Sequence, residues 1–275
     1  MMKITFLGGG NMAAALIGGL REKGFSAAGM QVVELNADVR AALTEKFGVR
    51  CTGAIDNSAL NCDALVLAVK PQQMKEAVQP LVGKLRTQLI ISIAAGLRSA
   101  DIARWLGGDH GNYDRIVRTM PNTPALIGAG ITGLCAAAGV DAEQKRLADT
   151  ILGAVGSTVW VEDEAQVDAV TAISGSGPAY VFYFIEALES AALELGFEPE
   201  AARKLAIETT LGAAKLAAHS DDAPAVLRER VTSKGGTTEA ALRSLDADQV
   251  RAAVARAAQA AAARGRELGM QLGQD

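Results

Sequence analysis

The segment Ile4-Thr-Phe-Leu-Gly-Gly-Gly-Asn-Met-Ala13 decides the fold of the first half of the chain. Its first four residues predict a short strand, and helix-forming residues run from Asn11 to about residue 23. The glycines between them allow a tight turn and a close approach of the backbone to a pyrophosphate, and the helix N-terminus offers free N–H groups. The residues expected at the pyrophosphate are Gly8, Gly9, Gly10, Asn11, Met12 and Ala13. This strand, turn and helix predict a dinucleotide-binding βαβ unit.

From residue 3 to about residue 162, short apolar runs alternate with helical segments. The runs predicted as strands are 4–7, 31–34, 64–69, 89–93, 115–119, 131–134 and 158–161. Such alternation is typical of parallel strands joined by crossover helices. The run 64–69 is apolar throughout, as in a strand that is covered on both faces. We therefore expect an α/β dinucleotide-binding domain over residues 1–162, built on a Rossmann-like doubly wound sheet.

After Glu162 the strand signals stop, and residues 163–275 are expected to form an all-α domain. Helices are predicted over 164–173, 177–195, 198–218, 223–231 and 238–268. The helix over 177–195 is apolar nearly all round, because it carries four aromatic residues: Tyr180, Phe182, Tyr183 and Phe184. A helix without a polar face is covered by its own domain or by another subunit. This domain is therefore a candidate for dimerisation.

The bulk composition excludes several classes of protein. The 275 residues are 49% hydrophobic and 21% charged, which is an ordinary globular balance. The net charge of −4 comes without blocks of one sign, so neither nucleic acid nor a membrane is an expected partner. The three cysteines lack Cys-x-x-Cys spacing, which argues against disulfides and a zinc site. Because no signal peptide or membrane-spanning run is evident, we expect a cytoplasmic protein.

Glu34 ends the second predicted strand, at the position where a carboxylate binds the ribose hydroxyls of a dinucleotide. A carboxylate there also repels a 2′-phosphate, which favours NAD over NADP. Arg40 or Lys46 could turn toward the same position, however, so both cofactors stay open.

Two further strand ends carry residues suited to the nicotinamide side. Lys70 follows the run 64–69 and is held at a defined boundary, because Pro71 fixes its own φ at the start of a helix. Ala95 and Gly96 follow the run 89–93, and their small size leaves room for a flat ring against the backbone.

Three turns carry polar groups suited to a small substrate. Two prolines stiffen Met120-Pro-Asn-Thr-Pro124, which presents the Asn122 amide. In Ser174-Gly-Ser-Gly-Pro178, Pro178 is expected at a first helical position and Ser176 is expected to cap that helix, whose free N–H groups suit a carboxylate. The hydroxyl-rich turn Thr232-Ser-Lys-Gly-Gly-Thr-Thr238 precedes another helix. The alternative for the last two turns is that each only begins a helix, in which case its role is structural.

Familiar catalytic sets are missing from the sequence. The two histidines, His110 and His219, lie in polar stretches away from these motifs, and no Ser-His-Asp set or metal-binding spacing is evident. A hydroxy-acid dehydrogenase needs a general base for its alcohol. The reduction of an imine has less need of one, because the substrate nitrogen can carry its own proton.

Six motifs, in order along nearly the whole chain, resemble those of the pyrroline-5-carboxylate reductase family. They are Phe6-Leu-Gly-Gly-Gly-Asn-Met-Ala13, Ala68-Val-Lys-Pro71, Ser92-Ile-Ala-Ala-Gly96, Arg118-Thr-Met-Pro-Asn-Thr-Pro124, Ser174-Gly-Ser-Gly-Pro-Ala-Tyr180 and Val231-Thr-Ser-Lys-Gly-Gly-Thr-Thr238. The resemblance implies hydride transfer from NADPH or NADH to 1-pyrroline-5-carboxylate, giving L-proline in the last step of proline biosynthesis. It also implies a homodimer or higher oligomer, whose active site is shared between one nucleotide domain and its partner's helical domain.

The resemblance also implies roles for particular residues. On the cofactor side these are the glycine turn, Asn57 near the adenosine, and Ala68, Val69, Lys70 and Pro71 near the nicotinamide. The residues expected to hold the substrate are Asn122, Ser176, Gly177, Ser233, Gly235, Gly236, Thr237 and Thr238. Our mechanistic hypothesis gives Thr238 a hydrogen bond to the imine nitrogen, and it names Lys70 as a second catalytic candidate. One departure is that Leu35 and Asn36 follow Glu34, where members that prefer NADP often carry a basic or small polar residue.

Two alternatives share this architecture. A β-hydroxyacid-type dehydrogenase would carry a catalytic lysine on the first long helix of the second domain, and residues 178–196 contain no lysine. A non-catalytic dimeric regulator that senses NAD(P) would not need the hydroxyl-rich turn at 232–238. Turnover of pyrroline-5-carboxylate distinguishes a reductase from both.

Overall fold

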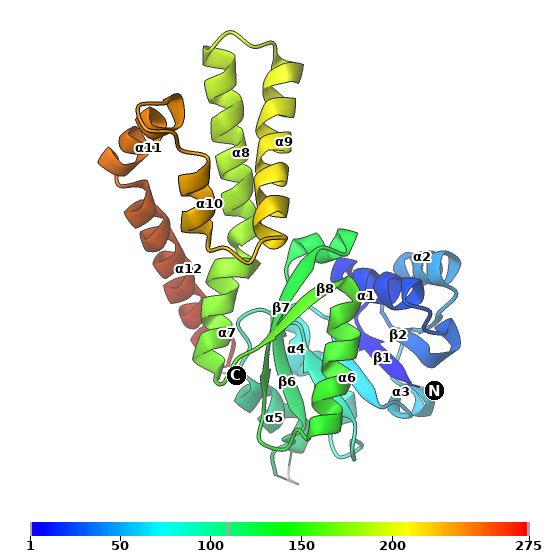
Figure 1. Cartoon of the computed structure of the whole chain (residues 1–275). Helices are drawn as coiled ribbons and strands as arrows, with labels where there is room; N and C mark the ends of the chain where they lie inside the picture. The colour runs from blue at the N-terminus through cyan, green and yellow to red at the C-terminus, as the bar shows by residue number, and fades with distance from the viewer. Residues whose placement is uncertain (1, 109–110, 274–275) are drawn as a thin grey trace. The chain divides into compact units, whose positions relative to one another are not determined.

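The computed structural model describes residues 2–108 and 111–273, so His110 lies outside the described residues. The chain divides into two compact units (Figure 1). Unit 1 comprises Met1–Ser176 and Ala261–Asp275, and unit 2 comprises Gly177–Ala260. Residues 163–176 and 261–273 thus pack in the same unit as the sheet, whereas the sequence pattern predicts them to be part of the helical domain.

An eight-stranded sheet, in the order β3-β2-β1-β4-β5-β6-β7-β8, forms the centre of the described part of unit 1. Its strands are β1 (Ile4–Leu7), β2 (Met30–Val33), β3 (Arg50–Thr52), β4 (Ala64–Leu67), β5 (Leu89–Ser92), β6 (Ile116–Met120), β7 (Gly130–Ala136) and β8 (Gly156–Trp160). Neighbouring strands are parallel except for β6 and β7, which pair antiparallel. The doubly wound fold is confirmed. Two details differ from the prediction: β3 was not predicted, and β7 and β8 run opposite to the other six strands.

Helices cover both faces of the sheet (Figure 1). Their bounds are α1 (Asn11–Glu22), α2 (Ala37–Phe47), α3 (Asn57–Leu60), α4 (Met74–Val78), α5 (Ser99–Gly107), α6 (Ala142–Leu152) and α7 (Glu164–Val170). Short 3₁₀ segments are Ala27–Gly29, Pro71–Gln73, Gln79–Leu81, Thr123–Ile127 and Gly153–Val155, and a π-helical turn spans Thr171–Gly175.

Alternating strand residues divide the core into two layers. Phe6 and Val66 pack with Leu16 of α1 on one face, whereas Leu67 and Ile90 belong to the layer on the other face. This period of two explains why the inner strands are apolar throughout, since both of their faces are buried.

Unit 2 is helical. The helices of the second half are α8 (Gly177–Glu194), α9 (Pro199–Ala218), α10 (Pro224–Arg230), α11 (Thr237–Ala247) and α12 (Val250–Leu272). The single helix predicted over 238–268 is therefore wrong, because the chain breaks between α11 and α12 at Asp248 and Gln249. Gln249 has a φ of 54°, which ends the helical path. Among the described residues, no helix is both long and apolar enough to cross a membrane.

Candidate active site

The glycine turn joins β1 to α1 at the carboxyl end of the sheet. Gly8 has a φ of +101°, and a Cβ atom there would lie 2.8 Å from the Ala68 carbonyl carbon. The Gly8 N–H also donates to the Val33 carbonyl at 2.8 Å. The structure thereby brings the turn against the ends of β2 and β4, which is why only glycine fits at this position.

The helix after the turn has an open N-terminus. Gly10 is its extended N-cap residue, and no side chain among the described residues caps it. A Cβ built at Gly10 would meet nothing within 4 Å, and Asn11 is exposed. Ala13 is fully buried and keeps α1 close to the sheet. The free N–H groups and positive end of this helix fit a pyrophosphate, as the sequence predicts.

Glu34 is held by two backbone groups. The Gly9 N–H donates to Glu34 Oε2 and the Asn36 N–H donates to Glu34 Oε1, each at 2.8 Å. Arg40 Nη1 donates to the carbonyls of Glu34 and Leu35 at 2.8 and 2.7 Å. The Glu34 carboxylate is therefore fixed beside the glycine turn, whereas the Arg40 guanidinium binds the main chain of Glu34 and Leu35.

The other cofactor candidates follow neighbouring strands. Lys70 and Ala95 are exposed after β4 and β5, and Val69 is partly buried. Pro71 begins a 3₁₀ turn, and Lys70 has an extended backbone before it. Because β2, β1, β4 and β5 are adjacent, the candidates on these strands share one edge of the sheet. Asn57 instead begins α3, between Asp56 and Ser58, which both bind Arg50.

Asn122 has a structural role that the sequence did not predict. Its Nδ2 donates to the Ser174 carbonyl at 3.1 Å, and its Oδ1 accepts from the Ile131 N–H at 3.0 Å. The side chain is buried and ties the π-helical turn to β7. Asn122 therefore braces the segment that carries Ser174 and Ser176.

The expected helix start at Ser176 is wrong. Ser176 has helical backbone angles, and its N–H donates to the Thr171 carbonyl at 2.8 Å. The π-helical turn connects α7 to α8, so Ser176 is not an extended N-cap with a free N–H group. Gly177 is the first residue of α8.

Arg118 is a buried cation that sequence reasoning left without a role. It is 2% exposed, and its guanidinium pairs with Asp168 at 2.6 Å and with Glu164 at 3.1 Å. Glu164 Oε1 also accepts from the Ser99 N–H at 2.8 Å. This network fixes α7, which leads directly into the π-helical turn. The available signal was an arginine that directly follows the apolar pair Ile116-Val117 within a predicted strand.

The hydroxyl-rich turn of unit 2 ends in a helix N-terminus. The Gly236 N–H donates to the Ser233 carbonyl at 3.0 Å, Gly235 has a φ of +73°, and its N–H donates to the Glu239 carboxylate. No side chain caps α11 among the described residues, and its first two residues are Thr237 and Thr238. Ser233 and Thr237 are exposed, and Thr238 is partly buried. Hydroxyls and open N–H groups therefore meet here, in an arrangement that suits a small carboxylate.

Three ionisable groups outside the candidate site have raised pKa values. Burial raises the pKa of the Cys62 thiol to about 11 and that of the Tyr113 hydroxyl to about 12, and it also raises the pKa of Cys135. Within residues 2–108 and 111–273, no cluster of His, Cys, Asp or Glu could hold a metal ion.

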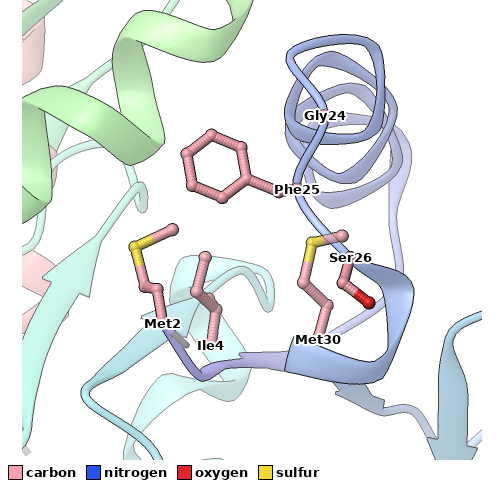
Figure 2. Close-up of a pocket in the computed structure, with 6 residues that line it drawn as sticks. All are labelled: Met2, Ile4, Gly24, Phe25, Ser26 and Met30. Carbon is pink, nitrogen blue, oxygen red and sulfur yellow. The ribbon is translucent and has the colours of Figure 1, made fainter.

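An apolar cavity of about 420 Å³ lies at the other end of the strands (Figure 2). Its lining includes Ile4 and Met30, the first residues of β1 and β2, together with Phe25. The glycine turn follows the opposite end of β1. This cavity is therefore separate from the candidate site, and its one side-chain hydroxyl, from Ser26, already accepts from the Ala28 N–H.

Two family models match the chain. Residues 164–268 match the family described as pyrroline-5-carboxylate reductase dimerisation, and residues 3–96 match the family described as NADP oxidoreductase, coenzyme F420-dependent. The two matches correspond to the helical segment and to the part of the sheet that carries the glycine turn.

Similar proteins cover nearly the whole chain. A pyrroline-5-carboxylate reductase of Pseudomonas aeruginosa is 46% identical over 99% of this chain and 98% of its own length, and one of Haemophilus influenzae is 41% identical over 96% and 97%. A solved reductase structure from Coxiella burnetii superposes with a TM-score of 0.91 at 42% identity, covering 97% of this chain and 98% of that one. A Plasmodium falciparum pyrroline carboxylate reductase, solved with NADP bound, gives 0.83 at 29% identity, with 98% of each chain covered. The chain belongs to the pyrroline-5-carboxylate reductase family.

Proposed function

We propose that this chain reduces 1-pyrroline-5-carboxylate to L-proline with NADPH or NADH. The observation that carries the proposal is the pair of open helix N-termini, one after the glycine turn and one after the hydroxyl-rich turn. The first suits a pyrophosphate, and the second suits a small carboxylate beside threonine hydroxyls. Family membership supports the pairing of these two ligands in one reaction.

The cofactor is held by the carboxyl edge of the sheet. Gly10, Asn11 and Met12 offer N–H groups to the pyrophosphate, and Glu34 lies where the adenosine ribose is expected. Ala68 to Pro71, with Ala95 and Gly96, are the proposed wall on the nicotinamide side. When bound, the reduced nicotinamide supplies the hydride that reduces the C=N bond at the carbon that becomes C5 of proline.

The substrate is held by the turn before α11. The N–H groups at the start of α11 bind the carboxylate, because the helix end carries a partial positive charge. The Thr238 hydroxyl hydrogen-bonds to the imine nitrogen and orients the ring. Most of the rate enhancement then comes from orientation and from polar groups that are fixed before the reaction.

The test of this assignment is the Thr238→Ala variant. Loss of one such hydrogen-bond donor lowers kcat/KM for pyrroline-5-carboxylate on the order of 10²-fold. Thr210→Ala is the matched control, because the Thr210 hydroxyl already bonds to the Ala206 carbonyl of its own helix at 2.9 Å. An unchanged kcat/KM in Thr238→Ala removes Thr238 from the mechanism.

A second subunit completes the protein. Phe182, Tyr183 and Phe184 of α8 are 65%, 76% and 52% exposed in the single chain, and α8 has no buried residue among those described. Apolar surface of this kind is typical of an obligate interface. This exposure and the match to a dimerisation family support a homodimer. We further propose that each active site combines the nucleotide domain of one subunit with the helical domain of its partner.

A further inference from the structure

The loop after β5, residues 93–98, carries Ala95 and Gly96 and is fixed at both ends. The Thr119 hydroxyl donates to the Ser92 carbonyl at 2.9 Å, and Glu164 accepts from the Ser99 N–H at 2.8 Å. Neither bond holds the middle of the loop, where Gly96 has a φ of +82°.

The middle of the loop lies against the last turns of α12. A Cβ atom built at Gly269 would lie 2.6 Å from the Gly96 carbonyl oxygen, and Gly269 is buried. From the other side, a Cβ built at Gly96 would lie 3.6 Å from Leu272 Cδ1 and 3.7 Å from the Gly269 nitrogen. The two backbones therefore touch without an intervening side chain.

One turn later, α12 is anchored to α5. Arg104 Nη2 donates to the Gly273 carbonyl at 3.0 Å and pairs with Asp101 at 3.0 Å. A Cβ at Gly273 would lie 2.3 Å from Asp101 Oδ2, so this contact is also closed to side chains. Leu272 packs against the core layer that includes Leu97 and Ile102. The end of α12 is therefore held in place where it meets Gly96.

We propose that Gly269 is a positioning residue for the cofactor, because it sets where the Ala95-Gly96 backbone lies. The inference rests on the proposed function, in which that backbone lines the nicotinamide side. Real Cβ atoms stay at least 3.0 Å from such an oxygen, so a methyl group at residue 269 forces a shift. Because α12 is anchored to α5 and the core, the loop is the part that moves.

The experiment compares Gly269→Ala with Gly265→Ala. Both replace a glycine of the same helix and gain the same helix propensity, but a Cβ at Gly265 would meet nothing within 4 Å. Three quantities are measured in each: the Kd for NADPH by titration, the rate of amide hydrogen exchange in residues 93–98 of the cofactor-free protein, and the KM for pyrroline-5-carboxylate. Gly269→Ala is expected to raise the Kd for NADPH about tenfold and to speed exchange in the loop. Gly265→Ala should match the unsubstituted protein in all three.

Equal Kd and exchange values for the two variants overturn the proposal, as does a lower Tm for Gly269→Ala with an unchanged Kd. If Gly269→Ala does not fold, Leu272→Ala removes the neighbouring contact with the loop and is expected to raise the Kd in the same way; an unchanged Kd there also overturns it. Failure of the unsubstituted protein to bind NADPH or NADH is a different result, because it refutes the proposed function on which the inference rests.

Discussion

Gly8 and Gly10 of the β1–α1 turn are glycine for different physical reasons. Gly8 has a positive φ and no space for a side chain beside Ala68, so the fold itself requires glycine there. Gly10 has an extended backbone and open space around its Cα atom, so the folded chain alone would accept other residues. In the proposed function Gly10 is glycine for the sake of the ligand, since a side chain there would fill the space of the pyrophosphate.

We propose that the Glu34 carboxylate acts on the choice between the two cofactors. The Glu34→Gln variant removes the negative charge beside the ribose position, which lessens repulsion of a 2′-phosphate. The ratio of kcat/KM for NADPH to kcat/KM for NADH is expected to rise about tenfold. This change corresponds to the loss of roughly 1.4 kcal/mol of repulsion. The matched control is Glu45→Gln, which neutralises an exposed carboxylate on α2. A ratio that does not change in Glu34→Gln contradicts a role for this charge.

At the level of helices and strands, the buried ion pairs of Arg118 connect β6 to α7. Arg118→Met leaves the Asp168 carboxylate, whose side chain is 11% exposed, without its cation. Removal of one partner of a buried pair lowers the free energy of unfolding by about 3–5 kcal/mol. In contrast, Arg50→Met breaks a pair whose side chains are 54% and 40% exposed, and it should cost at most about 1 kcal/mol. Urea denaturation of both variants checks the difference, and similar losses would contradict the account.

Prediction from the sequence succeeded best for elements with a strong pattern and failed where tertiary contacts decide. The apolar inner strands and long helices follow from periodicity. The three residues of β3, Arg50–Thr52, are too few for a pattern and lie at the edge of the sheet. The break at Gln249 lies among helix-forming residues, and the reversed direction of β7 and β8 leaves no trace in their composition.

The turn at Ser174 shows the same limit within the candidate site. Glycine, serine and proline there predict a fresh helix start, yet the π-helical turn continues the chain from α7. The Asn122 amide, 52 residues earlier, satisfies the Ser174 carbonyl. The sequence around Ser174 therefore gives no sign of this hydrogen-bond partner. The cofactor edge was easier to predict, because its residues follow strands whose order a doubly wound sheet fixes.

For the complete dimer, the proposed sharing of each active site between two subunits predicts complementation between two inactive variants. Gly10→Asp folds, because its Cβ atom meets nothing and aspartate is a good N-cap residue, but its carboxylate repels the pyrophosphate. Thr238→Ala instead removes the proposed substrate-binding hydroxyl, which belongs to the helical domain. Dimers that combine the two variants contain one site in which both halves are intact.

Mixing the two variants with subunit exchange should therefore restore about a quarter of the unsubstituted activity, since half of the dimers are mixed and each has one intact site. Each variant alone, treated in the same way, is the control. If each active site belonged to a single chain, the mixture would show no more activity than the two variants alone.

Isotope transfer tests directly whether the nicotinamide delivers a hydride to a cyclic imine. Pyrroline-5-carboxylate is incubated with the purified protein and NADPH or NADH that carries deuterium in the transferred position of the nicotinamide C4, and the product is examined by mass spectrometry and NMR. We predict L-proline with a single deuterium at C5, formed in equal amount to the oxidised cofactor. Proline without deuterium, or no oxidation of either cofactor, would contradict the account.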